Sequence, residues 1–182
     1  MIPMAPREDP AVVLITTPLG DIEVEVLRDR APVTSGNFLR YVDEGLLDGT
    51  TFFRTVAMDN QPDSEVKIEV IQGGTEPVDA AYPSQYPPIR HETTEETGLR
   101  HVDGAVSMAR WAPSTATSSF FICIGDQPEL NHGGGRNPDG QGFAAFGCVR
   151  HGMDVVKKIH SQPHQGQRLE PPIEITSCRR IS

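Results

Sequence analysis

The stretch TTFFRTV, residues 50–56, has the aromatic and β-branched composition of a half-buried β-strand. Strict alternation along it places Phe52, Arg54 and Val56 on one face of the strand. An arginine on an apolar face has two interpretations. It is either an edge residue that extends its charge to water, or a guanidinium held at the rim of an apolar cleft, where it can act on a ligand. This stretch alone favours the first interpretation, because arginine is rarely buried.

Strand patterns continue on both sides of this stretch. Residues 11–17 and 20–27 alternate apolar and polar side chains around a PLG turn, which predicts a hairpin. Further strand candidates, each bounded by Gly, Pro or Ser, are residues 66–74, 104–110, 118–125, 143–149 and 171–181. Residues 31–49 and 152–161 have the apolar spacing of helices. Because predicted strands outnumber helices about four to one, a β-barrel with two capping helices fits the pattern.

The length and composition are those of a single globular domain. The 182 residues are enough for one sizeable core, and we expect an extension at 1–10 followed by one domain at 11–182. The net charge is −9 with no Lys/Arg cluster longer than a pair, so we expect no nucleic-acid partner. The first residues lack the apolar core of a signal peptide, and no apolar run is long enough to cross a membrane. We therefore expect a cytoplasmic protein, or a periplasmic one if an export signal has been removed.

Neither the cysteines nor the histidines predict a metal site, since the helical spacing of His160 and His164 is interrupted by the helix-breaking Pro163. Cys123, Cys148 and Cys178 form an odd set without a C-x-x-C pair, which predicts reduced, buried thiols. The glycine-rich segment HGGGRNPDGQG, residues 132–142, lacks the Gly-Lys-Ser/Thr ending of a phosphate-binding loop, and we interpret it as a loop near a cleft. The sequence therefore predicts no metal and no cofactor.

Five blocks follow one another along the chain: APVTSGNFLRYVDEG (31–45), FFR (52–54), VIQGG (70–74), GAVSMAR through STATSSFFI (104–122) and AFGCVRHGMDVVKKI (145–159). In this order they resemble the cyclophilins, and the fourth block is closest to bacterial members. The resemblance extends from Val12 to about Ile181. It implies a mainly β fold, a closed eight-stranded antiparallel β-barrel capped by two α-helices. It also implies an enzyme, a peptidyl-prolyl cis–trans isomerase that assists protein folding.

The resemblance also implies the residues of the site. Arg54 matches the catalytic arginine, and Gln72 matches a glutamine that hydrogen-bonds it or the substrate backbone. Ala109 and Arg110 match a strand edge whose backbone groups bind the peptide. The implied substrate-binding residues are Phe53, Val70, Gln72, Ala109, Arg110, Phe121, Leu130 and Phe143. Without the resemblance, core packing is the favoured interpretation of the aromatic and aliphatic members of this set.

The implied partners are proline-containing peptides and unfolded or flexible proteins, bound by a monomer. Weak cyclosporin binding is expected, because Glu129 stands where many eukaryotic cyclophilins have a tryptophan. An alternative function is a proline-peptide-binding module with weak or no turnover, since Ile68 or Glu69 occupies the place of a usual pocket aromatic. The sequence leaves open the client proteins, the preferred residue before proline and the roles of the 57–67 insertion and the 132–142 loop.

Overall fold

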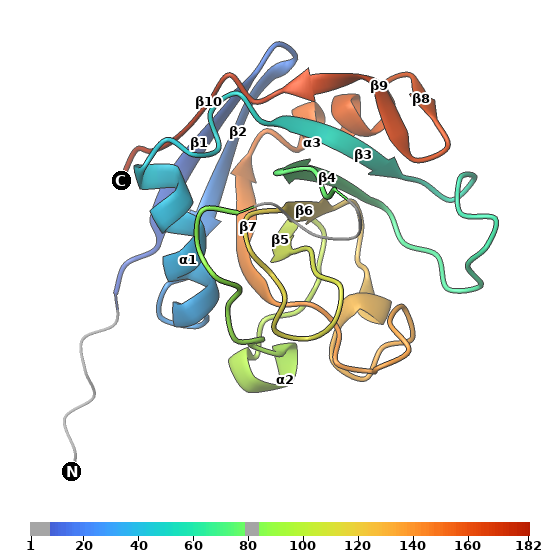
Figure 1. Cartoon of the computed structure of the whole chain (residues 1–182), viewed down its shortest axis with the longest axis horizontal. Coiled ribbons are helices and arrows are strands. Elements are labelled where there is room, and N and C mark those ends of the chain that lie inside the picture. The colour runs from blue at the N-terminus through green and yellow to red at the C-terminus, as the bar shows by residue number, and fades with distance from the viewer. Residues whose placement is uncertain (1–7, 79–83) are drawn as a thin grey trace.

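The computed structural model describes residues 8–78 and 84–182, which are built around one antiparallel sheet (Figure 1). The predicted extension, residues 1–10, lies largely outside the described residues. The strands are β1 (Ala11–Thr17), β2 (Gly20–Val26), β3 (Thr51–Val56), β4 (Val70–Gly74), β5 (Ala105–Met108), β6 (Phe120–Cys123), β7 (Ala145–His151), β8 (His164–Gln165), β9 (Arg168–Glu174) and β10 (Ser177–Arg180). The helices are α1 (Pro32–Asp43), α2 (Thr94–Thr97), α3 (Met153–His160) and the short 3₁₀ turn η1 (Pro128–Leu130).

The chain itself joins the two ends of the sheet. The strand order is β10-β1-β2-β7-β5-β6-β4-β3-β9-β8, so β10 and β9 lie at opposite ends although they are consecutive in sequence. Between them, Ile175 N donates to Thr50 O beside β3, and Thr176 N donates to Thr16 O in β1. The C-terminal segment thus bends from one end of the sheet to the other. Counting β9 and β10 as one bent strand, and setting the two-residue β8 aside, gives the predicted eight strands.

Two of the helices are those that the sequence predicts, and a third is not. Helix α1 packs Phe38 against Phe120 and Phe146, with ring centroids 5.5 and 4.9 Å apart. Helix α3 buries Val156 and Ile159 completely. The unpredicted helix α2 is a single turn, too short to show apolar periodicity. Its start is fixed locally, because the Thr93 side chain accepts a hydrogen bond from the backbone N–H of Glu96.

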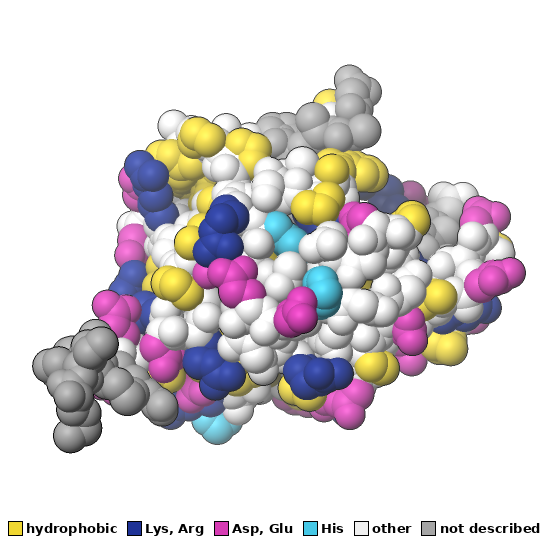
Figure 2. Space-filling view, turned by 90° about the horizontal axis from the view of Figure 1, so that it is seen from below, with side chains coloured by type: hydrophobic (Ala, Val, Ile, Leu, Met, Phe, Trp, Pro, Cys, Tyr) yellow, Lys and Arg dark blue, Asp and Glu magenta, His cyan; other side chains and the backbone are white. Residues whose placement is uncertain are grey.

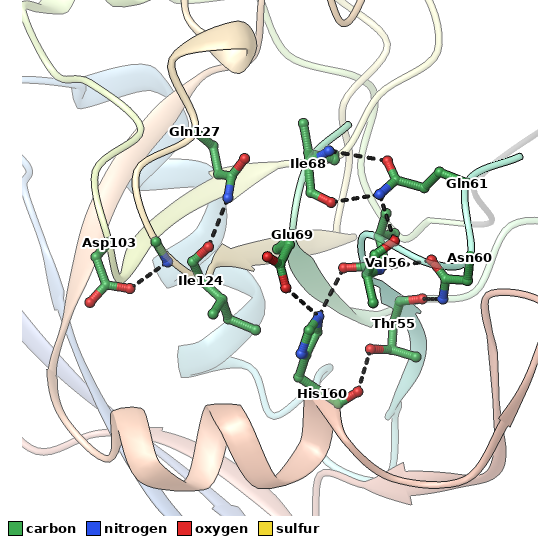
Figure 3. A network of polar contacts seen from close by, with 12 residues as sticks. Thr55, Val56, Asn60, Gln61, Ile68, Glu69, Asp103, Ile124, Gln127 and His160 are labelled. Carbon is green, nitrogen blue, oxygen red and sulfur yellow. Dashed lines mark hydrogen bonds and ion pairs between the residues drawn. The ribbon is translucent and has the colours of Figure 1, made fainter. Parts of the chain in front are cut away.

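The predicted strand at 66–74 begins only at Val70, because a side chain replaces its first backbone partners. Gln61 accepts from the backbone N–H of Ile68 at 3.1 Å and donates to its carbonyl at 2.8 Å. Figure 3 shows this pair of hydrogen bonds, which hold the segment before β4 as a loop. The predicted strand 171–181 is likewise divided, into β9 and β10, at the bend described above.

A bulge in β3 corrects the strict alternation expected for residues 50–56. The register with both neighbouring strands shifts between Phe52 and Arg54. Phe52 belongs to the large core cluster of the barrel, whereas Val56 belongs to a smaller cluster with Val70, Phe121 and Leu130. Because an extra residue in one strand turns the following side chains, Phe53 and Arg54 both line the same cleft. Arg54 therefore does not share a face with Phe52, although the alternation predicted that it would.

The cysteines agree with the prediction in part. All three are free; Cys123 and Cys178 are buried, while Cys148 is half-buried. Burial raises the pKa of the Cys178 thiol to about 12, so this thiol stays protonated at neutral pH. Within residues 8–78 and 84–182, no helix has both the length and the apolar character needed to cross a membrane.

Candidate active site

One cleft of about 430 Å³ opens over the smaller apolar cluster. It is lined by all nine residues that the sequence predicts for the site, namely Phe53, Arg54, Val70, Gln72, Ala109, Arg110, Phe121, Leu130 and Phe143. The other lining residues are outside that predicted set: Ile68, Pro77, Trp111, Arg136 and Asn137. Residues from distant segments, including β3, β4, β6 and the 132–142 loop, therefore meet at a single place.

The guanidinium of Arg54 is held by amide oxygens from two neighbouring strands. Arg54 and Gln72 are register partners in β3 and β4, and Arg54 Nη1 donates to Gln72 Oε1 at 3.0 Å, as expected. On the other side, Arg54 Nε and Nη2 donate to Gln167 Oε1 at 2.9 and 2.8 Å. Both glutamines are themselves fixed, since Gln72 Nε2 donates to Ser119 Oγ and Gln167 Nε2 donates to Asn60 O. The orientation of the arginine is thus set by a network.

No pattern in the sequence indicated a role for Gln167. It lies 113 residues from Arg54, in the turn between β8 and β9, within a polar segment that has no periodicity. The turn is nevertheless attached to β3, because Thr55 N donates to Gln167 O at 2.8 Å. Strand pairing of β3 with β9 is what brings the glutamine to the arginine, and that pairing is not readable from residue patterns alone.

The floor of the cleft is a ring stack. The Phe121 ring meets Phe143 edge-on, with centroids 5.2 Å apart and planes at 86°. The His101 ring is stacked on Phe121, with ring centroids 6.0 Å apart and planes at 11°. His101 is 1% exposed and bonds to Asn131 Oδ1 through Nδ1, at 2.8 Å, and to Ser107 Oγ through Nε2, at 2.9 Å. Burial lowers the pKa of His101 to about 4, so the stack rests on a neutral ring at pH 7.

One wall joins the 57–67 insertion to the 132–142 loop. Arg136 Nη1 donates to Gln61 Oε1, Ser64 Oγ and Val66 O at 2.9, 3.0 and 2.7 Å. Gln61 in turn holds the backbone of Ile68, which lines the cleft near the place where the resemblance implies an aromatic ring. The wall is therefore aliphatic at this point, and it is fixed by hydrogen bonds between two loops.

A second polar network connects α3 to the strands that carry Arg54 and Gln72, namely β3 and β4. His160, the last residue of α3, lies with Nε2 2.9 Å from Val56 O and 3.6 Å from a Glu69 carboxylate oxygen. Thr55 Oγ1 donates to His160 O at 2.8 Å. Figure 3 shows His160 reaching from the helix end toward the ends of β3 and β4. These contacts anchor the two strands that carry the arginine and its glutamine partner.

Residues 12–180 match the family described as cyclophilin type peptidyl-prolyl cis-trans isomerase/CLD, which covers both the barrel and the cleft. The chain belongs to the cyclophilins. Its activity is that of the family, peptidyl-prolyl cis–trans isomerisation.

Bacterial relatives of this cyclophilin are similar over most of its length. It is 37% identical to peptidyl-prolyl cis-trans isomerase A of Dickeya dadantii, over 81% of this chain and 70% of the relative. It is 36% identical to a peptidyl-prolyl cis-trans isomerase of Streptomyces antibioticus, over 90% of this chain and 95% of the relative. A crystal structure of a cyclophilin type isomerase from Cryptosporidium parvum shares the fold, with a TM-score of 0.73, 21% identity and coverage of 95% and 98% of the two chains.

At the strand edge beside the cleft, one of the backbone groups that the resemblance implied for peptide binding already has a partner. The backbone N–H of Ala109, expected to bind peptide, donates to Ser119 O at 3.0 Å and is already engaged. The next residue of the cyclophilin chain, Arg110, turns its side chain into the protein, where it is 1% exposed. Its guanidinium pairs with Asp139 in the 132–142 loop, at 3.0 and 3.1 Å. Nothing in the sequence indicated this partner.

Proposed function

We propose that this cyclophilin catalyses rotation about X–Pro bonds in flexible or unfolded proteins, with Arg54 as the catalytic residue. The bond has partial double-bond character and a rotation barrier of about 18–20 kcal/mol. As the amide twists, conjugation is lost and the prolyl nitrogen regains a lone pair. A donor aimed at that nitrogen stabilises the twisted state more than either planar state, and this difference is what accelerates the reaction.

The observation that carries the proposal is the orientation of Arg54 at an apolar cleft. Its hydrogen bonds to Gln72 and Gln167 fix the guanidinium before substrate arrives, so little reorganisation is needed during rotation. Arginine suits this role because it remains charged and presents a rigid fork of donors. The step makes and breaks no covalent bond, so the mechanism requires neither a nucleophile nor a general base.

The apolar floor supports ring binding in both isomers. Phe121, Leu130 and Phe143 offer a surface that a proline ring can occupy whether the preceding bond is cis or trans. Such contacts bind the ground states and the twisted state alike, which lowers KM without raising kcat. In this scheme the floor holds the ring and Arg54 supplies the rate enhancement.

The decisive experiment measures turnover and binding on the same molecule. We expect the protein to accelerate cis–trans exchange of a blocked Ala-Pro peptide, followed by NMR exchange spectroscopy. A proline-binding module would instead show saturable binding, by chemical-shift perturbation, with exchange rates equal to those of the free peptide. That second result would replace the enzymatic proposal with the alternative one.

Cyclosporin is expected to bind weakly. Glu129 is exposed at η1, where its carboxylate accepts a hydrogen bond from Gly135 N at 2.7 Å. Covering this carboxylate with an apolar ligand would remove it from water, which is costly for a charged group. Inhibition at nanomolar cyclosporin would contradict the proposal, and Glu129→Trp is expected to increase sensitivity.

We also propose a monomer in the cytoplasm. Within residues 8–78 and 84–182, the large exposed apolar side chains come from separate segments of the sequence: Leu46, Met58, Val78, Val102, Trp111 and Ile181. Figure 2 shows a face on which acidic, basic and apolar side chains are interspersed. Free cysteine thiols are consistent with a reducing compartment. Light scattering coupled to gel filtration tests the first proposal, and fractionation of the source cells tests the second.

A further inference from the structure

The side chain of Arg110 has no donor left to give a substrate. A guanidinium carries five N–H groups. In Arg110, Nε donates to Gly142 O, Nη1 donates to Trp111 O and Asp139 Oδ2, and Nη2 donates to Asp139 Oδ1 and Gly142 O. These are five hydrogen bonds, between 2.5 and 3.1 Å long. Although Arg110 lines the cleft, its polar atoms are all engaged within the chain.

One partner of Arg110, Gly142, is next to two residues of the proposed proline pocket. Phe143 follows Gly142 in sequence, and its backbone N–H donates to Leu130 O at 3.0 Å. Gly142 is so close to this segment that a β-carbon on it would lie 2.6 Å from Leu130 O, in a backbone conformation with φ +66°. The carbonyl bound by Arg110 therefore belongs to a tightly packed unit. That unit carries both Leu130 and Phe143.

Arg110 also acts directly on the Phe143 ring. Its Cζ lies 5.0 Å from the ring centroid, so the cation faces the ring on one side. The edge-on contact with Phe121 restricts the ring from another direction. Because the ring has few orientations left between these two neighbours, its position in the pocket depends on the position of the guanidinium.

We infer that Arg110 and Asp139 form a clamp that positions Phe143 and Leu130 for proline binding, and that Arg110 is a positioning residue rather than a substrate ligand. The inference deepens the proposed function of the same cleft and rests on it. Burying the Arg110 guanidinium has a desolvation cost, and an ion pair with a partly exposed carboxylate contributes little, so stability alone gives little reason for the pair. A bidentate fork fixes direction as well as distance, which is what the placement of a pocket wall needs.

The clamp predicts a specific kinetic signature. Phe143 and Leu130 would contact the proline ring in the planar and twisted states alike, so loosening them removes uniform binding. We expect Asp139→Asn and Arg110→Lys each to raise KM about tenfold, with kcat changed less than about twofold. The double variant Arg110→Lys/Asp139→Asn should be no worse than either single variant, because the two residues act as one unit.

The control is Asp43→Asn, which breaks another arginine–carboxylate pair by the same substitution. Asp43 pairs with Arg180 between α1 and β10, away from the cleft. It should leave kcat and KM unchanged. A further readout is the fluorescence of Trp111, the only tryptophan of the chain, whose carbonyl accepts from Arg110. Asp139→Asn should shift the Trp111 emission of the free protein, whereas Asp43→Asn should not.

The outcomes separate the clamp from the proposed function. If kcat falls while KM holds, or if Asp139→Asn leaves KM and emission unchanged, the clamp is wrong. If only Arg110→Lys raises KM, Arg110 binds substrate directly and the positioning role is again wrong. If Arg110→Lys does not fold, Asp139→Asn decides alone, since Asp139 is 33% exposed. If the wild type shows no turnover, the proposed function fails, but titration of the blocked Ala-Pro peptide by Trp111 fluorescence still measures whether Asp139→Asn weakens binding about tenfold.

Discussion

Arg54 and Arg110 line the same cleft, yet their guanidinium groups are held by different kinds of partner. Arg54 donates to the side-chain amides of Gln72 and Gln167, which carry no net charge. Arg110 is buried and donates to the carboxylate of Asp139, which is partly exposed. Amide partners orient a cation without neutralising it, whereas a carboxylate partner does both. On the proposed mechanism, this difference separates an arginine that acts on the substrate from an arginine that fixes the pocket around it.

The first way to test this difference is Arg54→Ala. Loss of one preorganised donor typically costs about 2.7–4 kcal/mol, so kcat should fall by about 10²–10³, with a much smaller effect on peptide binding. Arg54→Lys should recover little, because a flexible point charge does not reproduce the fork. The measurement is kcat and KM on a blocked Ala-Pro peptide, with a thermal melt of each variant. Near-wild-type turnover, or loss through unfolding alone, would make Arg54 a structural residue.

His101 provides the case of a buried ring with no counter-charge among its hydrogen-bond partners. Its Nδ1 proton points to Asn131 Oδ1, which also accepts from the His101 backbone N–H, while Nε2 accepts from the Ser107 hydroxyl. With a folded pKa of about 4 and an unfolded value of about 6.5, protons bind the unfolded chain preferentially between these values. The contribution to stability is complete above about pH 6.5 and is lost as the pH falls toward 4.

This lowered pKa should cost the protein about 2 kcal/mol of unfolding free energy between about pH 7.5 and about pH 5. Urea unfolding at the two pH values measures it, with His101→Gln as the control that lacks a titrating ring. The difference between wild type and control in pH dependence is attributable to His101. An equal pH dependence in both proteins would show that His101 protonates as readily when folded as when unfolded.

A sharper test converts the surroundings of Arg54 into those of Arg110. Gln167→Glu keeps an oxygen where Arg54 Nε and Nη2 donate, but it adds a negative charge. If a negative charge added beside Arg54 weakens its action on the prolyl nitrogen, kcat should fall about tenfold, equivalent to about 1.4 kcal/mol, although the hydrogen bonds remain. Gln167→Ala is the matched variant that loses the orientation and keeps the charge. Wild-type kcat in Gln167→Glu would mean that orientation alone is sufficient, and the contrast between the two arginines would lose its meaning.

The sequence identified the Arg54 side of the cleft well. Arg54, Gln72 and Phe121 lie in the ordered blocks that resemble the cyclophilins, and it was this resemblance that implied the Arg54–Gln72 hydrogen bond seen in the structure. The bulge in β3 could not be predicted, because a one-residue irregularity does not change the apolar pattern of such a short strand. The expected alternation therefore placed Arg54 on the same strand face as Phe52, which is wrong.

The partners of the two arginines that lie in turns and loops could not be predicted from the sequence. Gln167 and Asp139 lie in polar segments, where many residues satisfy the backbone equally well and no period distinguishes one position from the next. The direction of the Arg110 side chain could not be predicted either. The place of Arg110 beside the cleft was predicted, but the direction of its side chain depends on a loop whose path the sequence does not encode in any pattern.

The smallest expected effect concerns the pH dependence of the Arg110 side. The hydrogen bonds from Arg110 hold the pKa of the Asp139 carboxyl below its usual value. Asp139 is therefore ionised at every pH above the ordinary carboxyl range. The clamp is lost only as the pH falls through this lowered pKa. His91 lies beside the pair, donating through Nε2 to Gln141 O, and burial lowers its pKa as well. The other charged group that acts on His91 is Glu96.

KM for a blocked, uncharged Ala-Pro peptide should therefore change less than about twofold between about pH 8 and about pH 5, because the Asp139 carboxylate remains ionised throughout. Asp139→Asn is the reference, since it has no carboxylate to protonate at this position. A wild-type KM that rises on acidification toward that of Asp139→Asn, while the variant stays constant, would show that the carboxylate titrates in this range. Arg110 would then hold Asp139 too weakly to fix Phe143. Arg54 and Arg110 would differ in the charge of their partners, but Arg110 would not make its side of the cleft more rigid.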